Sequence, residues 1–142
     1  MSKKRIIGTT AAAIKDAEFQ LKMRLPESFV EWLLLNNGRS LGALVIFPVY
    51  DSRDPRKTWE SIVKVYDGSW SDWLENFSDD GKDFSGLLPF AEFGTGDFYC
   101  FNYKSLGSSG EPVVGIWSHE TGDFLEVADS FNAFVNSSNR PG

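Results

Sequence analysis

The sequence contains very few of the residues from which catalytic and metal sites are usually built. Its 142 residues include one cysteine, Cys100, and one histidine, His119. A single cysteine cannot form a disulfide within the chain or a cysteine-rich zinc site, so neither an oxidising compartment nor a structural zinc of that kind is required. A metal site at His119 would need carboxylates such as Glu120 and Asp123, and acids in a turn after a strand are the simpler interpretation. We therefore expect no metal and no cofactor.

A cysteine–histidine pair is the main catalytic alternative that the sequence leaves open. Cys100 and His119 fall on predicted adjacent strands, where a thiol and an imidazole could serve as nucleophile and base. However, Cys100 stands within an aromatic strand, where a free cysteine usually behaves as a small buried hydrophobe. A glycosidase uses two carboxylates whose separation in space decides their chemistry, and the sequence does not give that separation, so this alternative stays open. We predict that Cys100 is buried and that the protein is not an enzyme.

Two further motifs are explained more simply by turns than by ligands. Gly94-Thr95-Gly96 precedes a predicted strand and lacks the lysine and the helix N-terminus that hold phosphate, so a hairpin turn is expected. Asp79, Asp80 and Asp83 lack the spaced ligands and the terminal glutamate of an EF-hand. These acids are expected to be solvated loop residues.

The sequence also lacks a hydrophobic run of the roughly 20 residues that a membrane-spanning helix needs. Lys3-Lys4-Arg5 followed by Ile6-Ile7 imitates a secretion signal. Gly8-Thr9-Thr10 and then Lys15-Asp16 interrupt the apolar stretch before a signal core has formed. We expect a cytoplasmic protein that does not contact a membrane.

Basic residues are scarce after the N-terminal forty residues. The chain carries a net charge of −6, yet residues 1–40 carry +3. Residues 67–129 hold thirteen acidic residues against only Lys82 and Lys104, a net charge of −11. Direct binding to DNA or RNA is disfavoured, because a patch of Lys and Arg must neutralise the phosphates. The acids form either a solubilising surface or a nucleic-acid-like face for a basic protein partner.

The residues that are abundant indicate a folded α+β domain. Hydrophobic residues make up 42% of the chain, with 12 Phe and 5 Trp, which excludes a disordered protein. One domain over residues 1–142 is expected, with a core over about 10–135 and a polar tail over 136–142. Thr10 and Pro26 mark the starts of two N-terminal helices, and Asp129 or Ser130 caps a final one. The remaining patterns predict helices over residues 58–66 and 71–77 and strands over 44–49, 87–93, 98–103, 113–117 and 124–127. The fold class is therefore α+β, with a single, mainly antiparallel, twisted sheet packed with two N-terminal helices and a C-terminal helix.

The order of short motifs is also informative. The first half begins with a predicted helix that carries Glu18, followed by a Leu-Pro step at Leu25-Pro26 and an aromatic helix over residues 29–33. An Asn-Gly stop at Asn36-Asn37-Gly38 and a strand over residues 44–48 come next. The second half continues with Leu-Leu-Pro-Phe-Ala (87–91), Gly-Thr-Gly-Asp-Phe-Tyr-Cys-Phe (94–101), Pro-Val-Val-Gly-Ile-Trp-Ser-His-Glu (112–120) and Val-Ala-Asp-Ser-Phe-Asn-Ala-Phe (127–134). Over roughly residues 14–135, this order resembles the SUKH superfamily, which includes a fungal regulator of cell-wall glucan synthesis and many bacterial immunity proteins of toxin systems.

The resemblance implies a non-enzymatic protein-binding module. The expected role is that of an immunity protein that neutralises a basic toxin domain, such as a nuclease, by occluding its active or substrate-binding surface. A regulatory scaffold like the fungal member is the first alternative. A carbohydrate-binding or carbohydrate-active domain, using exposed tryptophans and acids, is the second.

Partner specificity is expected in residues 51–85, which match no family pattern. This region combines tryptophans with acids, so an acidic, aromatic surface could imitate the polyanionic substrate of a toxin. The predicted partner-binding residues are Trp70, Asp72, Trp73, Glu75, Asp79, Asp80 and Asp83. Trp59 is a further candidate anchor, and for each tryptophan core packing is the alternative.

Overall fold

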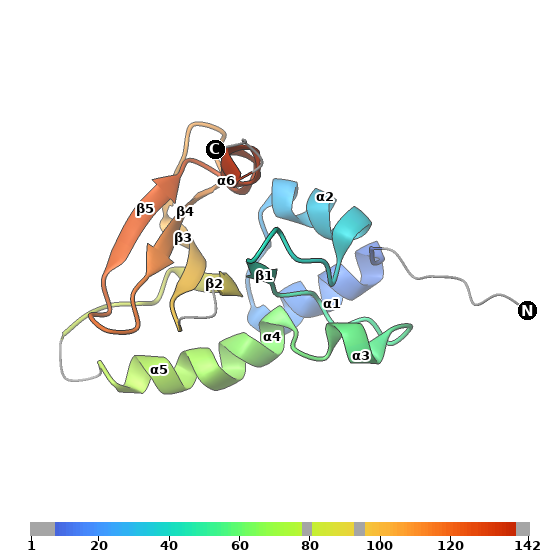
Figure 1. Ribbon diagram of the computed structural model, residues 1–142, viewed down its shortest axis with the longest axis horizontal. Helices are drawn as coiled ribbons and strands as arrows, with labels where there is room; N and C mark the ends of the chain where they lie inside the picture. The colour runs from blue at the N-terminus through green and yellow to red at the C-terminus, as the bar shows by residue number, and fades with distance from the viewer. Residues whose placement is uncertain (1–7, 78–80, 93–95, 139–142) are drawn as a thin grey trace, which may run out of the picture.

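A five-stranded antiparallel sheet forms the centre of the protein, as the sequence predicts. The computed structural model describes residues 8–77, 81–92 and 96–138. The strands are β1 (Val45–Ile46), β2 (Leu87–Glu92), β3 (Phe98–Leu106), β4 (Pro112–Trp117) and β5 (Phe124–Ala128). They pair in chain order from β1 to β5, so that β1 and β5 are the two edges (Figure 1). The α+β fold class is confirmed.

Helices precede, interrupt and follow this sheet. They are α1 (Ala11–Leu21), α2 (Glu27–Asn36), α3 (Pro55–Thr58), α4 (Ile62–Val65), the π-helical turn η1 (Tyr66–Trp70), α5 (Ser71–Glu75) and α6 (Phe131–Ser138). The predicted caps are confirmed at both ends, since Thr10 Oγ1 accepts from the Ala13 amide at 3.2 Å and Ser130 Oγ accepts from the Ala133 amide at 3.1 Å. Within the described residues, no helix has both the length and the apolar character needed to cross a membrane.

The first strand is shorter than predicted, and local chemistry explains the difference. A strand over residues 44–49 is expected, but β1 has two residues. Phe47 still donates its amide to the Phe90 carbonyl at 2.9 Å, whereas Pro48 has no amide to donate. The side chain of Asn37 then bonds both backbone groups of Val49, at 2.9 and 3.0 Å, so the ladder ends there.

The expected break between two helices near residue 68 is wrong. The elements α4, η1 and α5 form one continuous helix, seen in green in Figure 1. Ser61 caps its start by accepting from the Lys64 amide at 3.2 Å. Gly68 lies in the π-helical turn instead of ending the helix. Packing of this segment on the sheet outweighs the intrinsic cost of glycine, which is about 1 kcal/mol in a helix interior.

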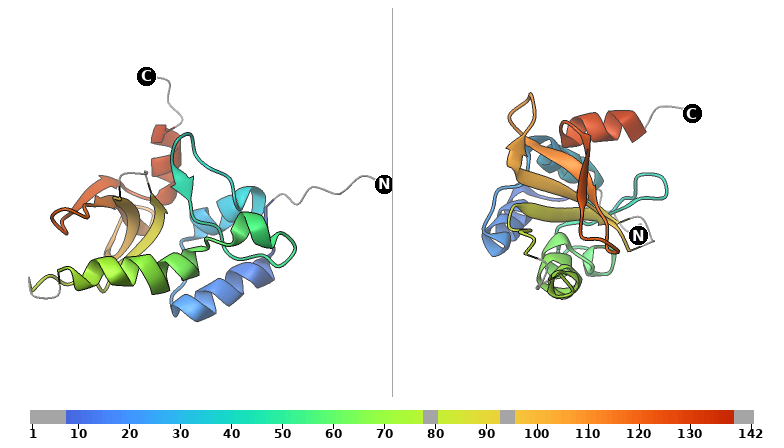
Figure 2. Two further views of the ribbon diagram at one scale, coloured as in Figure 1. Left: turned by 60° about the horizontal axis from the view of Figure 1, so that its bottom comes forward. Right: turned by 90° about the vertical axis from the view of Figure 1, so that its left-hand side faces the viewer.

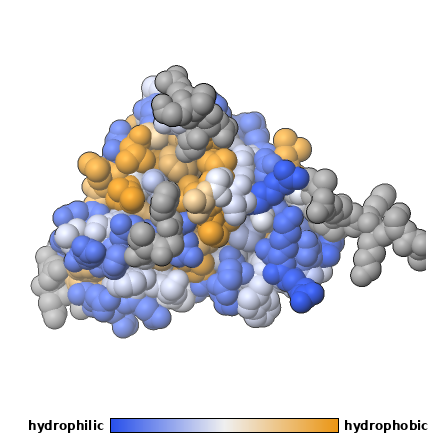
Figure 3. All heavy atoms as spheres, viewed as in Figure 1, coloured by the Kyte–Doolittle hydropathy of each residue, from blue (hydrophilic) through white to orange (hydrophobic). Residues whose placement is uncertain are grey.

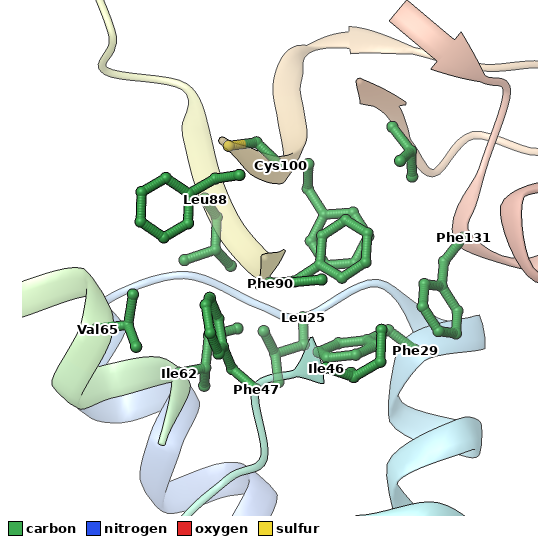
Figure 4. Packing of buried hydrophobic residues seen from close by; sticks show 14 of the residues in the cluster. Leu25, Phe29, Ile46, Phe47, Ile62, Val65, Leu88, Phe90, Cys100 and Phe131 are labelled. Atoms are coloured by element: carbon green, nitrogen blue, oxygen red, sulfur yellow. The ribbon is translucent and has the colours of Figure 1, made fainter. Parts of the chain in front are cut away.

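The buried residues form one hydrophobic cluster that fills both faces of the sheet. On one face, Phe29 from α2 meets Phe90 from β2 at 5.7 Å and Phe131 from α6 at 4.9 Å between ring centroids (Figure 4). On the other face, Trp70 from η1 packs against Phe98 and Trp117 at 5.6 and 4.9 Å. Cys100 is fully buried, as predicted.

Candidate partner-binding surface

The predicted site residues that the structure brings together lie on the outer side of α5. Asp72 and Glu75 are exposed there, Asp67 is exposed on η1, and Trp73 is half-buried beside them. We call these four residues the α5 surface. In both Figure 1 and the left panel of Figure 2, α5 lies at the end of the molecule that also carries β5, away from α3.

Trp70 supports this surface from beneath. Its side chain is 2% exposed and contacts Trp117 and Phe98. In this structure Trp70 is therefore a core residue, the alternative that the sequence leaves open, and its ring is not available at the surface. The indole Nε1 of Trp117 next to it is buried and has no hydrogen-bond partner among the described residues.

Trp73 joins α5 to the turns at the end of the sheet. Its ring lies 5.1 Å from the ring of His119, between centroids. The carboxylate of Asp97 lies 2.7 Å from His119 Nδ1 and also accepts the backbone amide of His119 at 3.0 Å. One carboxylate oxygen thus fixes both the ring and the turn that follows β4. The pairing of His119 with Asp97 is therefore explained by its role in holding this turn, and no catalytic role is needed to explain it.

The structure does not favour the cysteine–histidine alternative. Burial raises the pKa of the Cys100 thiol well above its ordinary value. The thiol is thus kept protonated, which is the opposite of what an activated nucleophile requires. Among the residues described, no group of three or more His, Cys, Asp or Glu side chains is arranged to hold a metal ion.

Both lysines of the acid-rich region are already paired. Lys104 bonds Asp83, which also accepts the Ser85 amide at 3.0 Å. The hydrogen bond from Lys104 is the main cause that holds the pKa of Asp83 far below its usual range. Lys82 bonds Asp123 at 3.0 Å and lowers the pKa of that carboxyl. The lysines therefore leave the acids of the α5 surface uncompensated.

The other predicted site residues are placed as follows. Asp83 is exposed but engaged with Lys104, as just described. Asp79 and Asp80 lie outside the described residues. Trp59 is 59% exposed but stands apart from the α5 surface, with Lys64 Nζ 4.6 Å from its ring centroid. It lines a groove of about 320 Å³ together with Asp16, Gln20 and Tyr50.

Sequence reasoning missed two exposed apolar residues on the edge strand β5. Leu125 is 67% exposed and Val127 is 48% exposed. In the sequence, residues 124–128 look like an ordinary half-buried strand. Only the order of the strands in the sheet shows that β5 lies at an edge. No sequence signal distinguishes Leu125 and Val127 from Val113 or Val114, which are buried.

Comparison with known proteins places the whole of this architecture in one family. A search of curated proteins finds no match. The model of the SMI1 / KNR4 family (SUKH-1) matches residues 8–137, which include the helices, the sheet and the α5 surface. The match spans most of the 142 residues, and so the chain belongs to the SMI1 / KNR4 family (SUKH-1).

Proposed function

We propose that this protein is an immunity protein, a non-enzymatic binding module that neutralises a basic bacterial toxin domain. The observation that carries the proposal is the uncompensated charge of the α5 surface. Asp67, Asp72 and Glu75 are exposed, and no ion pair joins them to a basic side chain in the part of the chain that the structure describes. Membership of the SUKH-1 family supports the binding role.

The proposed mechanism is occlusion. A surface whose charges are all negative attracts a basic domain over a distance of about one Debye length, roughly 8 Å at physiological salt, and orients it before contact. The half-buried Trp73, on the same helical segment as these acids, then offers an aromatic contact, and such side chains often dominate binding energy. If the substrate of the toxin is polyanionic, the acidic surface of this protein carries the same sign of charge as that substrate and would cover the site where the substrate binds.

The experiment starts from the gene next to this one. The variable C-terminal domain of a large secreted protein encoded there is expressed in bacteria with and without this chain, and survival is counted. We expect survival only with the chain, together with a stable complex of the two purified proteins. If the neighbouring domain is not toxic, or if it is toxic and the chain neither protects nor binds, the proposal is wrong.

A matched pair of variants tests the surface. Asp72→Lys with Glu75→Lys reverses two charges of the α5 surface, and Asp16→Lys with Glu31→Lys reverses two exposed acids on α1 and α2. The first variant is expected to slow association about 10-fold at low salt and to flatten its salt dependence, and the second to change neither. Equal effects of both variants would show that total charge, not this surface, controls binding.

A second candidate function rests on Trp59. An exposed indole beside Tyr50, with Asp16 and Gln20 in the same groove, is an arrangement suited to a sugar ring. Retention on polysaccharide columns, lost in Trp59→Ala, would support this function. Passage without retention would exclude it for the polymers tried.

A further inference from the structure

The single histidine of the chain contacts residues from two separate parts of the fold. His119 follows β4, and its imidazole Nδ1 lies 2.7 Å from the carboxylate of Asp97, which precedes β3. The ring of Trp73, from α5, lies 5.1 Å from the imidazole, between centroids. A Cβ built at Gly96 would come within 3.1 Å of the same Nδ1, so the backbone also packs closely on the ring. The imidazole is therefore held in one place by several neighbours.

One nitrogen of this imidazole is available for a proton. An ionised carboxylate only accepts hydrogen bonds, so Nδ1 of His119 carries the hydrogen that it donates to Asp97. Nε2 of the neutral ring then has a lone pair, and no residue of the described ranges forms a hydrogen bond with it. The side chain of His119 is 24% exposed, so water can deliver a proton to Nε2.

Protonation would give the imidazole two attractive contacts that the neutral ring lacks. The cation would form an ion pair with Asp97, at the 2.7 Å that already separates the two groups. It would also lie 5.1 Å from the centroid of the Trp73 ring, within the roughly 6 Å at which an indole attracts a cation. A proton on His119 would thus strengthen the link between α5 and the turn after β4.

The other charged groups near this contact do not change their charge between mildly acidic and neutral pH. They are Glu120, Asp123 and Lys82 at the turn itself and Asp72 and Glu75 on α5. Lys82 is paired with Asp123 at 3.0 Å, and the remaining acids are exposed. Figure 3, drawn in the view of Figure 1, shows hydrophilic residues over the lower left of the molecule, where α5 lies. Histidine is the side chain that ordinarily titrates in this range, so the change of charge belongs to His119.

We propose that His119 is a proton-dependent positioning residue, which holds Trp73 more firmly against the turn after β4 at mildly acidic pH than at neutral pH. The proposal needs no partner protein. It goes beyond the proposed function by stating what fixes the aromatic member of the α5 surface. The same turn also packs on the residues after α5, because a Cβ built at Gly122 would lie 3.0 Å from the ring of Phe77. The response is therefore expected in the side chain of Trp73 and not in the fold as a whole.

The test uses the chain alone and measures NMR relaxation of the indole N–H groups at pH 5.5 and pH 7.5. The order parameter of the Trp73 indole is expected to be higher by about 0.1 or more at pH 5.5. Trp59 is the internal control, because its ring is 59% exposed and lies beside Lys64, so its order parameter should be equal at both pH values. Trp73→Phe assigns the signal.

Two variants separate the proton on the imidazole from the ion pair. His119→Gln cannot take up a proton and is expected to abolish the difference between the two pH values, and His119→Phe serves if that variant does not fold. Asp97→Asn keeps an oxygen that can accept the His119 amide and removes the charge, and it should at least halve the difference. Circular dichroism of each variant at both pH values shows that it is folded.

The outcomes decide the inference without reference to any toxin. An order parameter of Trp73 that is the same at both pH values in the wild type would overturn it, and so would a difference that persists in His119→Gln. An undiminished difference in Asp97→Asn would overturn it as well, because the ion pair would then not be its cause. The immunity function is tested by protection and binding, and none of these results changes that test.

Discussion

Acidic side chains serve opposite purposes in two regions of this molecule. In the loop that follows β1, Asp51 is turned inward, since it is 5% exposed and accepts hydrogen bonds from Thr9 at 2.8 Å and from Arg53. Glu111 reaches the start of α2 and accepts from both the amide and the hydroxyl of Ser28, at 3.1 and 2.6 Å. At the end formed by α5 and β5, acids such as Asp72 and Glu126 are exposed instead.

This difference shows that a count of charges does not indicate what the charges do. Glu111 belongs by sequence to the acid-rich segment 67–129, yet it satisfies the free amide at the start of a helix that Pro26 cannot cap through a side chain. The inward acids contribute to stability, and the outward acids are available for a partner. The predictions below test this division, beginning with the apolar core on which both regions depend.

The largest effect is expected from the core. Phe90→Ala removes a fully buried ring that contacts Phe29, Phe101 and Phe131, and should lower the free energy of unfolding by about 3–5 kcal/mol. Urea unfolding followed by tryptophan fluorescence measures the change. Phe19→Ala is the control, because that ring is 83% exposed and should change the midpoint little. Similar losses in both variants would contradict the assignment of Phe90 to the core.

The next largest effect is expected from the buried hydrogen bonds between Asn37 and Val49. Asn37→Ala removes the side chain that bonds both backbone groups of Val49, and leaves two buried groups without partners. The expected loss in the free energy of unfolding is about 2–3 kcal/mol. Asn36→Ala is a matched control in the same helix, since it removes one bond, to the Trp32 carbonyl at 3.1 Å, at a half-buried site. An equal loss of unfolding free energy in the two variants would show that the hydrogen bonds to Val49 stabilise the fold no more than the bond of Asn36 does.

A smaller and pH-dependent effect is expected at Asp51. The hydrogen bonds from Arg53 are the largest cause that lowers the pKa of Asp51 far below its ordinary value, with Thr9 adding to them. Because the folded-state pKa is lowered, the stabilisation is fully present above about pH 4 and is lost as the pH falls further. Asp51→Asn should cost about 1–2 kcal/mol at pH 7, a modest value since Arg53 is 45% exposed.

The measurement for Asp51 is the difference in unfolding free energy between wild type and Asp51→Asn at a series of pH values. Other carboxyl groups titrate in both proteins and cancel in that difference. We expect the gap to be constant at neutral pH and to narrow as the pH falls below about 4. A gap that is independent of pH over this range would mean that the carboxylate charge is not what Thr9 and Arg53 stabilise.

The sequence predicts the elements of this fold better than its surfaces. Helical periodicity, the caps at Thr10 and Ser130 and the aromatic composition of β3 are local signals, and local structure follows them. The helix break at Gly68 was predicted wrongly because the packing of Trp70 on the sheet is a long-range contact. The exposure of Leu125 depends on strand order, and the pairing of Lys104 with Asp83 joins residues 21 positions apart. Such features appear only when the chain is folded.

The smallest effect on stability is expected where the effect on binding is large. Asp72→Lys with Glu75→Lys should leave the urea midpoint nearly unchanged, because both side chains are exposed and no ion pair holds them among the described residues. Asp72 lies early in α5, but α4, η1 and α5 are continuous, so it does not stand at a helix N-terminus and gains little from the helix dipole. Urea unfolding at low and high salt measures this. A clear loss of stability in this variant would show that the outward acids also hold the fold together, and the division between the two regions would be wrong.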